Sequence, residues 1–245
     1  ERNAQDGDRL LGAFNRPMPH WLDFFCYTMF VDRDGKFQLG MLSTSAFKPL
    51  AASMGPMLKE ESFHLGTGSN GLRRVIKAGI IPLDMLQRYF NKWVSTAHDL
   101  FGVDASSSAH WSYVWGVKGR WDERKKLEAG IEVDKEVLNE EARGHYHTEI
   151  VGEVGKLNGY LPEGAKKLVV PHENFYREIG PFRKQRYTTE GEPFTGTDEE
   201  WKAYLHVTLP TAQDEEDLKE FFKQEWVANK PLSARQIASG IGAKA

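Results

Sequence analysis

The sequence has one cysteine, no long apolar run and no marked excess of charge of either sign. The single cysteine, Cys26, excludes a disulfide within the chain and fits a reducing cytoplasm, where we expect the protein to reside. Cys26 stands in an aromatic run, so we expect its thiol to be buried and unreactive. No apolar run approaches the ~20 residues that cross a bilayer, and no basic and apolar leader is present, so we expect no membrane partner.

The formal net charge of −3 is small for 245 residues, and it gives no electrostatic reason to expect nucleic acid as a partner. Hydrophobic residues make up 40% of the chain, which is enough for one sizeable core with a small appendage. The sequence opens on Glu1 rather than methionine, and a polar stretch follows as far as Arg9. We therefore expect the chain to be the remainder of a longer protein.

Helical patterns dominate the earlier part of the chain. After two prolines, apolar residues recur at steps of three and four from Trp21 to Leu42, which predicts one helix. Gly35 weakens this helix without ending it. The same period, with glycines and prolines at the ends, predicts three more helices: Pro49 to Arg74 or Ala78 (ended by Gly79 and Pro82), Leu83 to Leu100, and Val133 to Tyr160.

The helix that starts near Pro49 combines apolar residues with glycines. Its apolar residues predict a buried stripe, made of Leu50, Met54, Met57, Leu58, Phe63 and Leu65. The glycines in its later part, Gly66, Gly68 and Gly71, either loosen the helix or allow another element to pack closely against it.

The predicted fold is all-α, with a helical bundle over residues 1–165. From residue 166 the pattern changes, because Leu168 to Pro171 indicates a short extended piece and Thr188 to Gly196 is rich in turn residues. Charged residues dominate from Asp198 to Lys223. We expect residues 166–245 to form an irregular extension wrapped on the bundle.

Glu61 and His64 are the clearest candidates for chemistry. Three residues apart on a helix, a carboxylate and an imidazole share one face and can reach the same metal ion. Helix bundles that hold two irons use this Glu-x-x-His device on two helices and one carboxylate from each of two others. Iron accepts these ligands and can keep positions open for O2. Four residues with two specified are also found by chance, so a surface glutamate beside a packed histidine stays an alternative.

Asp32 is the third candidate ligand. It directly follows an aromatic stretch, where a carboxylate is costly unless it is paired or bound to a metal. Its neighbours Arg33 and Asp34 also allow the alternative of a solvated turn. We interpret Glu60, next to Glu61, as a supporting or solvated residue.

Longer motifs surround these residues: Leu11-Gly12-Ala13-Phe14-Asn15, Phe30-Val31-Asp32-Arg33-Asp34-Gly35-Lys36, Lys59-Glu60-Glu61-Ser62-Phe63-His64-Leu65-Gly66-Thr67-Gly68 with Gly71-Leu72-Arg73-Arg74, Asp99-Leu100-Phe101-Gly102, and Pro171-His172-Glu173-Asn174-Phe175-Tyr176-Arg177. Together they resemble the oxygenase components of benzoyl-coenzyme A 2,3-epoxidases, over roughly residues 10 to 230. The C-terminal stretch from about Ser233 is less similar.

The resemblance implies the second half of a ferritin-like bundle with a di-iron centre. The two iron ions would activate O2 to epoxidise the aromatic ring of benzoyl-CoA in aerobic benzoate degradation, with electrons from a separate NADPH-dependent reductase. Asp32, Glu61 and His64 match three of the family's six ligands, which are four carboxylates and two histidines. The family takes the other three from two earlier helices that have no counterpart here, so we expect this chain to be the C-terminal portion of a larger oxygenase.

The chain offers no clear substitutes for the other three ligands. Glu141, His145 and Glu149 have metal-ligand spacing, but we interpret them as pairs on a helix surface. The other histidines considered lack a partner at ligand spacing, and we interpret them as packed or hydrogen-bonded: His98, His110 and His172.

Substrate contacts are less specific. Five aromatic residues could line a pocket for the ring or could simply form the core: Trp21, Phe24, Phe25, Phe30 and Phe63. Thr67, one turn beyond His64, could support the site through a hydrogen bond. Four basic residues could contact the phosphates of coenzyme A or lie on a solvated face: Arg73, Arg74, Lys77 and Lys118.

Two other functional classes stay open. One is a non-catalytic helical scaffold subunit, or an inactive fragment, of a multicomponent monooxygenase; Asp32, Glu61 and His64 argue against the scaffold. The other is a zinc hydrolase, which lacks its usual His-Glu-x-x-His motif here.

Overall fold

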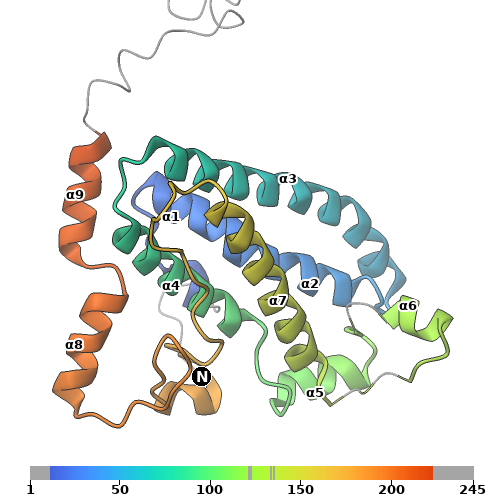
Figure 1. The fold of residues 1–245 in the computed structure, drawn as a ribbon. Coiled ribbons are helices and arrows are strands. Elements are labelled where there is room, and N and C mark those ends of the chain that lie inside the picture. Colours follow the sequence, from blue (N-terminus) through green and yellow to red (C-terminus); the bar gives the residue numbers. More distant parts are fainter. Residues whose placement is uncertain (1–11, 121–122, 133, 135, 223–245) are drawn as a thin grey trace, which may run out of the picture. The chain divides into compact units, whose positions relative to one another are not determined.

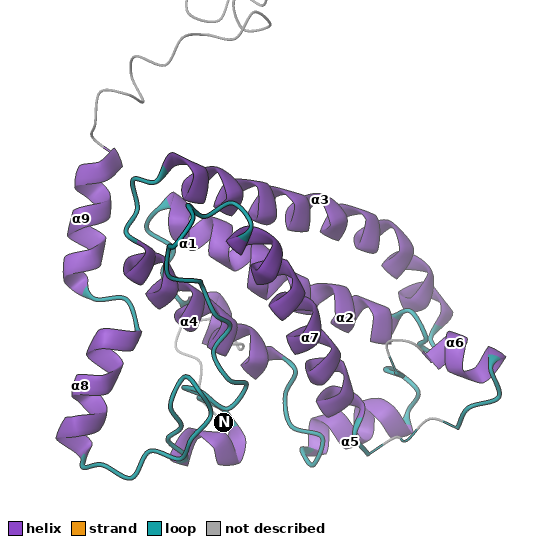
Figure 2. Cartoon of the chain, in the orientation of Figure 1, coloured by secondary structure: helices purple, strands orange, loops and turns teal. Residues whose placement is uncertain are grey.

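The computed structural model describes residues 12–120, 123–132, 134 and 136–222. Within this part of the chain the regular elements are helices, joined by loops, with one isolated β-bridge between Tyr187 and Pro193 (Figure 2). The all-α prediction is therefore confirmed. None of the described helices combines the length and the apolar character that crossing a membrane requires. The polar opening to Arg9 and the last part of the expected extension, 223–245, lie outside the described residues.

The chain divides into two compact units, Glu1–Pro210 and Thr211–Ala245. The second unit contains α9 (Ala212–Phe222), whose start is marked by hydrogen bonds from the N–H and hydroxyl of Thr211 to the carboxylate of Asp214. The division that we expect at residue 165, between a bundle and its extension, is a separate hypothesis and stays a prediction.

One continuous helical rod runs from Trp21 to Leu42, as predicted. It consists of α1 (Trp21–Cys26), a π-helical turn η2 (Tyr27–Val31) and α2 (Asp32–Leu42). Gly35 lies inside α2 without ending it. Figure 1 shows α1 and α2 as a rod that lies alongside α3 (Lys48–Ala78), and the three elements of the rod all contact α3. The π-helical turn η2 points to a functional site nearby, because such turns inside α-helices are frequent at functional sites.

Glycine in α3 allows this close approach. A Cβ added at Gly68 would lie 2.5 Å from the backbone nitrogen of Met29, and one added at Gly71 would collide with the ring of Phe25. The predicted close packing is therefore confirmed at these two positions. A Cβ at Gly66 would meet nothing within 4 Å. The helix ends at Gly79, as predicted, in the left-handed conformation (φ 65°) that glycine adopts without a Cβ clash.

The predicted buried stripe of α3 is only partly correct. Met54 is buried, but Met57 is 43% exposed and Phe63 is 76% exposed. Periodicity alone assigns both residues to the core. Met57 stands one turn before Glu61 on the side of α3 that faces the rod and is only partly covered there, whereas no described element covers Phe63.

The core forms around α4 (Leu83–Leu100), whose bounds match the prediction. Its largest buried side chains include Tyr89, Phe90 and Trp93, and the Phe90 ring packs edge-on against Phe30 of the rod. Asp23 is also fully buried, and its Oδ1 accepts hydrogen bonds from Trp93 Nε1 (2.8 Å) and Lys92 Nζ (2.7 Å). Cys26 is fully buried, which confirms the prediction for its thiol.

The helix α7 (Leu138–Asn158) begins five residues later than the predicted start at residue 133. The carboxylate of Asp104 accepts hydrogen bonds from the backbone N–H groups of Asn139 and Glu140, both at 2.9 Å. These bonds satisfy donors that every helix start leaves unpaired. The cap comes from a residue about 35 positions earlier in the chain, so the sequence near residue 133 does not reveal it.

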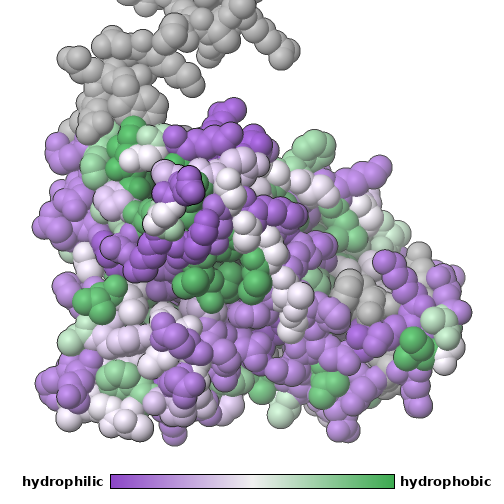
Figure 3. Space-filling view, viewed as in Figure 1, coloured by the Kyte–Doolittle hydropathy of each residue, from purple (hydrophilic) through white to green (hydrophobic). Residues whose placement is uncertain are grey.

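The remaining elements are short: η1 (Gly12–Asn15), α5 (Ser107–Val114), α6 (Glu123–Glu128), η3 (Gly180–Lys184) and α8 (Asp198–Thr208). Residues 166–197 are irregular apart from η3, as expected for the extension. The charged stretch that follows is helical instead, because Thr197 and Glu200 form a capping box at the start of α8. The face seen in Figure 3 is largely hydrophilic, with hydrophobic side chains gathered near its centre.

Candidate functional site

Asp32, Glu61 and His64 come together where the rod lies against α3. Asp32 is the first residue of α2 after the π turn, and Glu61 and His64 lie one turn apart on α3. His64 Nδ1 is 3.6 Å from Glu61 Oε2 and 3.9 Å from Asp32 Oδ2. One ligand atom from each residue lies within 4.8 Å of the other two. The structure thus brings together the three residues that the sequence identified as candidate ligands.

Two glycines shape the space around this cluster. The close contact at Gly68 holds the rod near α3, one turn beyond His64. Gly35 lies one turn after Asp32, and a Cβ there would be 3.2 Å from Glu61 Oε1. A side chain at position 35 would therefore crowd the Glu61 carboxylate. The glycine that looked only like a weak point in a helix leaves room for this carboxylate.

The carboxylates of the cluster are poorly solvated and have the same charge. The side chains of Asp32 and Glu61 are only 19% and 14% exposed. Burial raises the pKa of Asp32 to about 6, and burial followed by the charge of Asp32 raises the pKa of Glu61. Glu61 Oε1 is buried and has no hydrogen-bond partner in the described part of the chain. A cation between the carboxylates would offset both the loss of solvation and the repulsion between the two negative charges.

This donor set fits a metal ion. Two carboxylate oxygens and one imidazole nitrogen are the hard and borderline ligands that iron and similar divalent ions accept. The His64 side chain is 57% exposed, so the cluster is open on that side within the described residues. Among these residues, it is also the one group of three or more acidic, histidine or cysteine side chains close enough to share an ion.

The residues after Asp32 are not a solvated turn, so that alternative is wrong. Arg33 and Asp34 are 5% and 3% exposed. Arg33 donates to Glu149 of α7, and Asp34 Oδ1 accepts a hydrogen bond from Gln38 at 3.2 Å. Burial raises the pKa of Asp34 to about 8. The sequence shows three charges in a row and cannot reveal which neighbours cover them.

The second group considered, on α7, forms ordinary ion pairs. Glu149 accepts from Arg33 and, at 2.6 Å, from Lys36, while Glu141 pairs with Arg120. Glu141 and Glu149 therefore pair with residues outside α7, whereas the sequence spacing suggests pairs with His145 on the same helix. Both carboxylates are engaged by cations of the protein, and the interpretation of this group as structural rather than metal-binding stays a prediction.

Two of the remaining histidines behave as predicted. His98 is fully buried, and its Nε2 shares a hydrogen bond with His147 Nδ1 at 3.2 Å. His172 Nδ1 accepts the backbone N–H of Asn174. His110 packs edge-on against the ring of Trp111 and is exposed.

The buried His98 predicts a pH effect on stability. Burial and the nearby charges of Arg177, His147, Arg143 and His172 lower its pKa well below the ordinary 6.5. Below pH 6.5 the unfolded chain binds a proton at this residue while the folded chain does not, so acid favours unfolding. We expect His98 to contribute a loss of up to about 1.4 kcal/mol of unfolding free energy per pH unit. Urea unfolding of wild type and His98→Gln between pH 5 and 7 measures this, because other titrating groups cancel in the difference; parallel pH profiles would contradict it.

The aromatic residues considered for a substrate pocket separate into two groups. Phe30 is fully buried in the core, whereas Trp21 is 61% exposed. Phe25 and Phe63 line an open groove of about 430 Å³ along α3, together with Thr67 and Arg74. The Thr67 hydroxyl donates to the carbonyl of Phe63, so it supports the helix rather than the cluster. Two of its lining residues, Ser62 and Phe63, directly precede His64 in the sequence.

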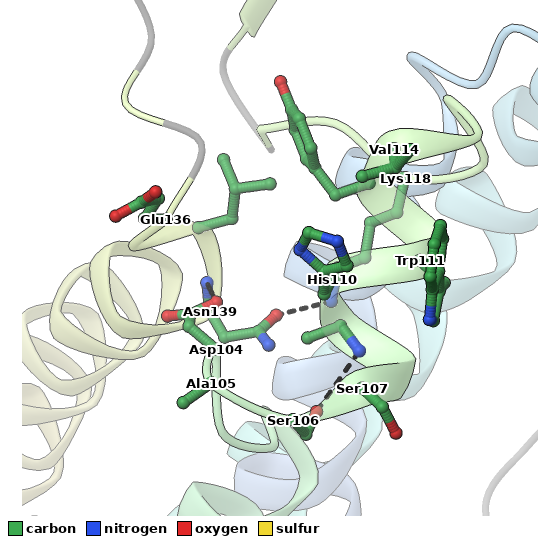
Figure 4. Close-up of a pocket in the computed structure, with 13 residues that line it drawn as sticks. Asp104, Ala105, Ser106, Ser107, His110, Trp111, Val114, Lys118, Glu136 and Asn139 are labelled. Atoms are coloured by element: carbon green, nitrogen blue, oxygen red, sulfur yellow. Dashed lines mark hydrogen bonds between the residues drawn. The ribbon is translucent and has the colours of Figure 1, made fainter.

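Another pocket lies elsewhere, between α5 and the start of α7, and has a volume of about 590 Å³ (Figure 4). Its lining includes His110, Trp111 and Lys118, but none of the three clustered ligands. Lys118 donates to Asn139 Oδ1 (2.6 Å) and Gln38 Oε1 (3.2 Å), and burial lowers its pKa. Lys118 thus bridges two side chains of the protein and does not lie on a solvated helix face.

Comparison with known proteins adds two findings. A family model described as phenylacetic acid catabolic protein matches residues 2–180. Benzoyl-CoA oxygenase component B of Aromatoleum evansii is 34% identical over 257 aligned positions, which cover 87% of this chain and 54% of the relative. The chain therefore spans about half the length of this curated relative. These matches confirm the resemblance found in the motifs and, with the helical structure, the ferritin-like fold class.

Proposed function

Because the chain belongs to the phenylacetic acid catabolic protein family, we propose that it contributes part of a di-iron site to an oxygenase acting on benzoyl-CoA. The observation that carries the proposal is the convergence of Asp32, Glu61 and His64 from two helices, with a buried carboxylate oxygen that lacks a partner. The 34% identity to a benzoyl-CoA oxygenase component supports the substrate.

In the proposed reaction one atom of O2 is added across the 2,3-bond of the aromatic ring, and the other leaves as water. Two electrons from a separate NADPH-dependent reductase and two protons from the solvent complete this balance. The iron ions, when bound, supply the activation of O2. Asp32, Glu61 and His64 would hold these ions. Because the two carboxylates are largely buried, their ionised forms are destabilised unless the positive charge of a metal balances them.

We propose that the groove along α3 binds the aromatic ring of benzoyl-CoA. Phe25 and Phe63 give it apolar walls next to the helix turn that carries His64. An apolar wall keeps water from a reactive ring and orients it by contact rather than by charge. The single, buried thiol of Cys26 supports the proposed cytoplasmic location, because thiols stay reduced in that compartment.

The site in this chain supplies three ligands, and we propose that the others come from a part of the protein outside it. The chain covers 54% of the matched relative. Within the described part of the chain, the side chain of His64 is 57% exposed and Phe63 is 76% exposed. Further bundle helices packed beside α3 would both complete the ligand set and cover these side chains.

A non-catalytic scaffold is the alternative function. Two adjacent, poorly solvated carboxylates lower the stability of a fold. In an oxygenase metal binding compensates for this loss, whereas in a scaffold nothing does. The glycine that makes room for Glu61 is also unnecessary in a scaffold. Both observations favour the oxygenase.

The test is iron content and turnover of the complete gene product, purified with added Fe²⁺. We expect about two irons per polypeptide by elemental analysis, and conversion of benzoyl-CoA that requires O2 and a reductase. The 245-residue chain alone is expected to bind Fe²⁺ weakly and to turn over no benzoyl-CoA. Absence of iron from the complete protein would reject the oxygenase, and full activity of the chain alone would reject the shared site.

A further inference from the structure

A second, basic pocket lies between the loop at residues 176–178, the segment 183–186 and α8. Its volume is about 330 Å³, and its lining includes Tyr176, Arg177, Arg183, Lys184, Arg186 and Trp201. Four of these six side chains carry a positive charge and two are aromatic. None of the three clustered ligands contributes to it, so the pocket is distinct from the candidate metal site.

Two of the four cations are already neutralised inside the protein. The guanidinium of Arg177 pairs with Asp99 and also donates to the carbonyls of Glu173 and His98, and its side chain is fully buried. Arg186 pairs with Asp198 at 2.6 Å. These two residues build the wall of the pocket and have little charge to offer a ligand.

The other two cations have no internal partner. Arg183 and Lys184 are exposed, and neither forms an ion pair with any described residue. The one acidic side chain in the lining, Glu178, is engaged by Arg16 at 2.7 Å. After internal pairing, two positive charges face the same small pocket, and an anion is the partner that this arrangement lacks.

The pocket is also held rigidly. Arg183 and Lys184 sit at the end of η3, and the neighbouring Phe182 ring lies 4.3 Å from the guanidinium of Arg177. The Trp201 indole stacks on Tyr204, with 5.7 Å between the ring centroids and 17° between the planes. Tyr176 has a φ of 48°, a left-handed conformation that is strained for a tyrosine. Residues held in strained conformations concentrate at ligand sites.

We propose that this basic pocket binds the phosphorylated adenosine end of a coenzyme A thioester. Arg183 and Lys184 bind its phosphates, and the aromatic surface of Trp201 packs against the adenine. Guanidinium and ammonium groups bind phosphate through charge-assisted hydrogen bonds. A nucleobase such as adenine stacks on an indole ring through its flat aromatic face. The choice of coenzyme A among nucleotides rests on the proposed function, whereas the nucleotide phosphate site rests on the pocket alone.

Isothermal titration of the iron-free 245-residue chain with coenzyme A tests the proposal. We expect binding that weakens as salt is raised, and we expect Arg183→Gln/Lys184→Gln to raise Kd at least about tenfold, since each lost charge-assisted contact is worth a factor of this order. The control is Lys48→Gln/Lys125→Gln, which removes the same charge from exposed positions outside the pocket and should leave Kd unchanged.

Pyrophosphate and uncharged adenosine serve as partial ligands. Weaker binding of each than of coenzyme A supports a site with both a phosphate and a base contact. Pyrophosphate binding as tight as that of coenzyme A would overturn the adenosine contact. No binding of coenzyme A, or binding unaffected by the double substitution at an unchanged melting temperature, would overturn the site. Iron content of the complete protein does not depend on these outcomes, so a failure here is distinct from a failure of the proposed function.

Discussion

Replacing Glu61 by glutamine is expected to lower the affinity for Fe²⁺ by more than about 100-fold and, without metal, to stabilise the fold. Supporting residues of metal sites contribute roughly 10- to 100-fold in affinity, so a direct ligand should exceed that range. The stabilisation follows because the carboxylate is buried beside Asp32 and Glu61 Oε1 has no hydrogen-bond partner in the described structure. Glutamine keeps the size of the side chain and removes the charge.

Iron titration and thermal unfolding of the same complete protein measure the two effects. Glu60→Gln is the matched control, because Glu60 is exposed on the same turn of α3 and should change neither quantity. A substitution that lowers metal affinity but raises the stability of the metal-free protein is typical of a functional site, because such sites lower stability in return for activity. A Glu61→Gln protein with normal iron content would remove Glu61 from the ligand set. Lower stability without metal would show that Glu61 has a structural role instead.

Replacing Gly68 by alanine is expected to lower the free energy of unfolding by about 2 kcal/mol, although alanine is the better helix former by up to ~1 kcal/mol. The added Cβ would lie 2.5 Å from the backbone nitrogen of Met29, and backbone cannot move aside as a flexible side chain can. The rod would have to shift away from α3. Because Asp32 is carried by that rod, we also expect weaker Fe²⁺ binding.

Gly66→Ala is the control on the same helix, since nothing lies within 4 Å of the Cβ that it adds. It should stabilise the protein by up to ~1 kcal/mol through helix propensity alone. Urea unfolding of both variants gives the comparison directly. Equal stabilities of the two variants would mean that the close approach of the rod and α3 is not required for the fold.

The three candidate ligands were predictable from the sequence, through one local pattern and the resemblance of longer motifs. Glu61 and His64 share a helix face by their spacing. The apolar stretch before Asp32 left a ligand and a solvated turn both open, and the resemblance of the surrounding motif to the oxygenase family singled Asp32 out. That the two helices meet with the three side chains facing one another depends on packing, to which Gly68 is the main sequence clue. The basic pocket had no comparable signal, since Arg183 and Lys184 look like any charged turn until Trp201, far along the chain, is placed beside them.

The sequence by itself determined where the helices lie, from the rod at Trp21 to α4 at Leu83–Leu100, and which three residues could hold a metal. Apolar period, prolines and terminal glycines act within a few residues, so they can be interpreted without a fold. Only the tertiary structure decided which charges are buried, as for Asp34, and which apolar residues are not, as for Phe63. Burial is set by what packs against a residue, and its partners lie in other elements of the chain.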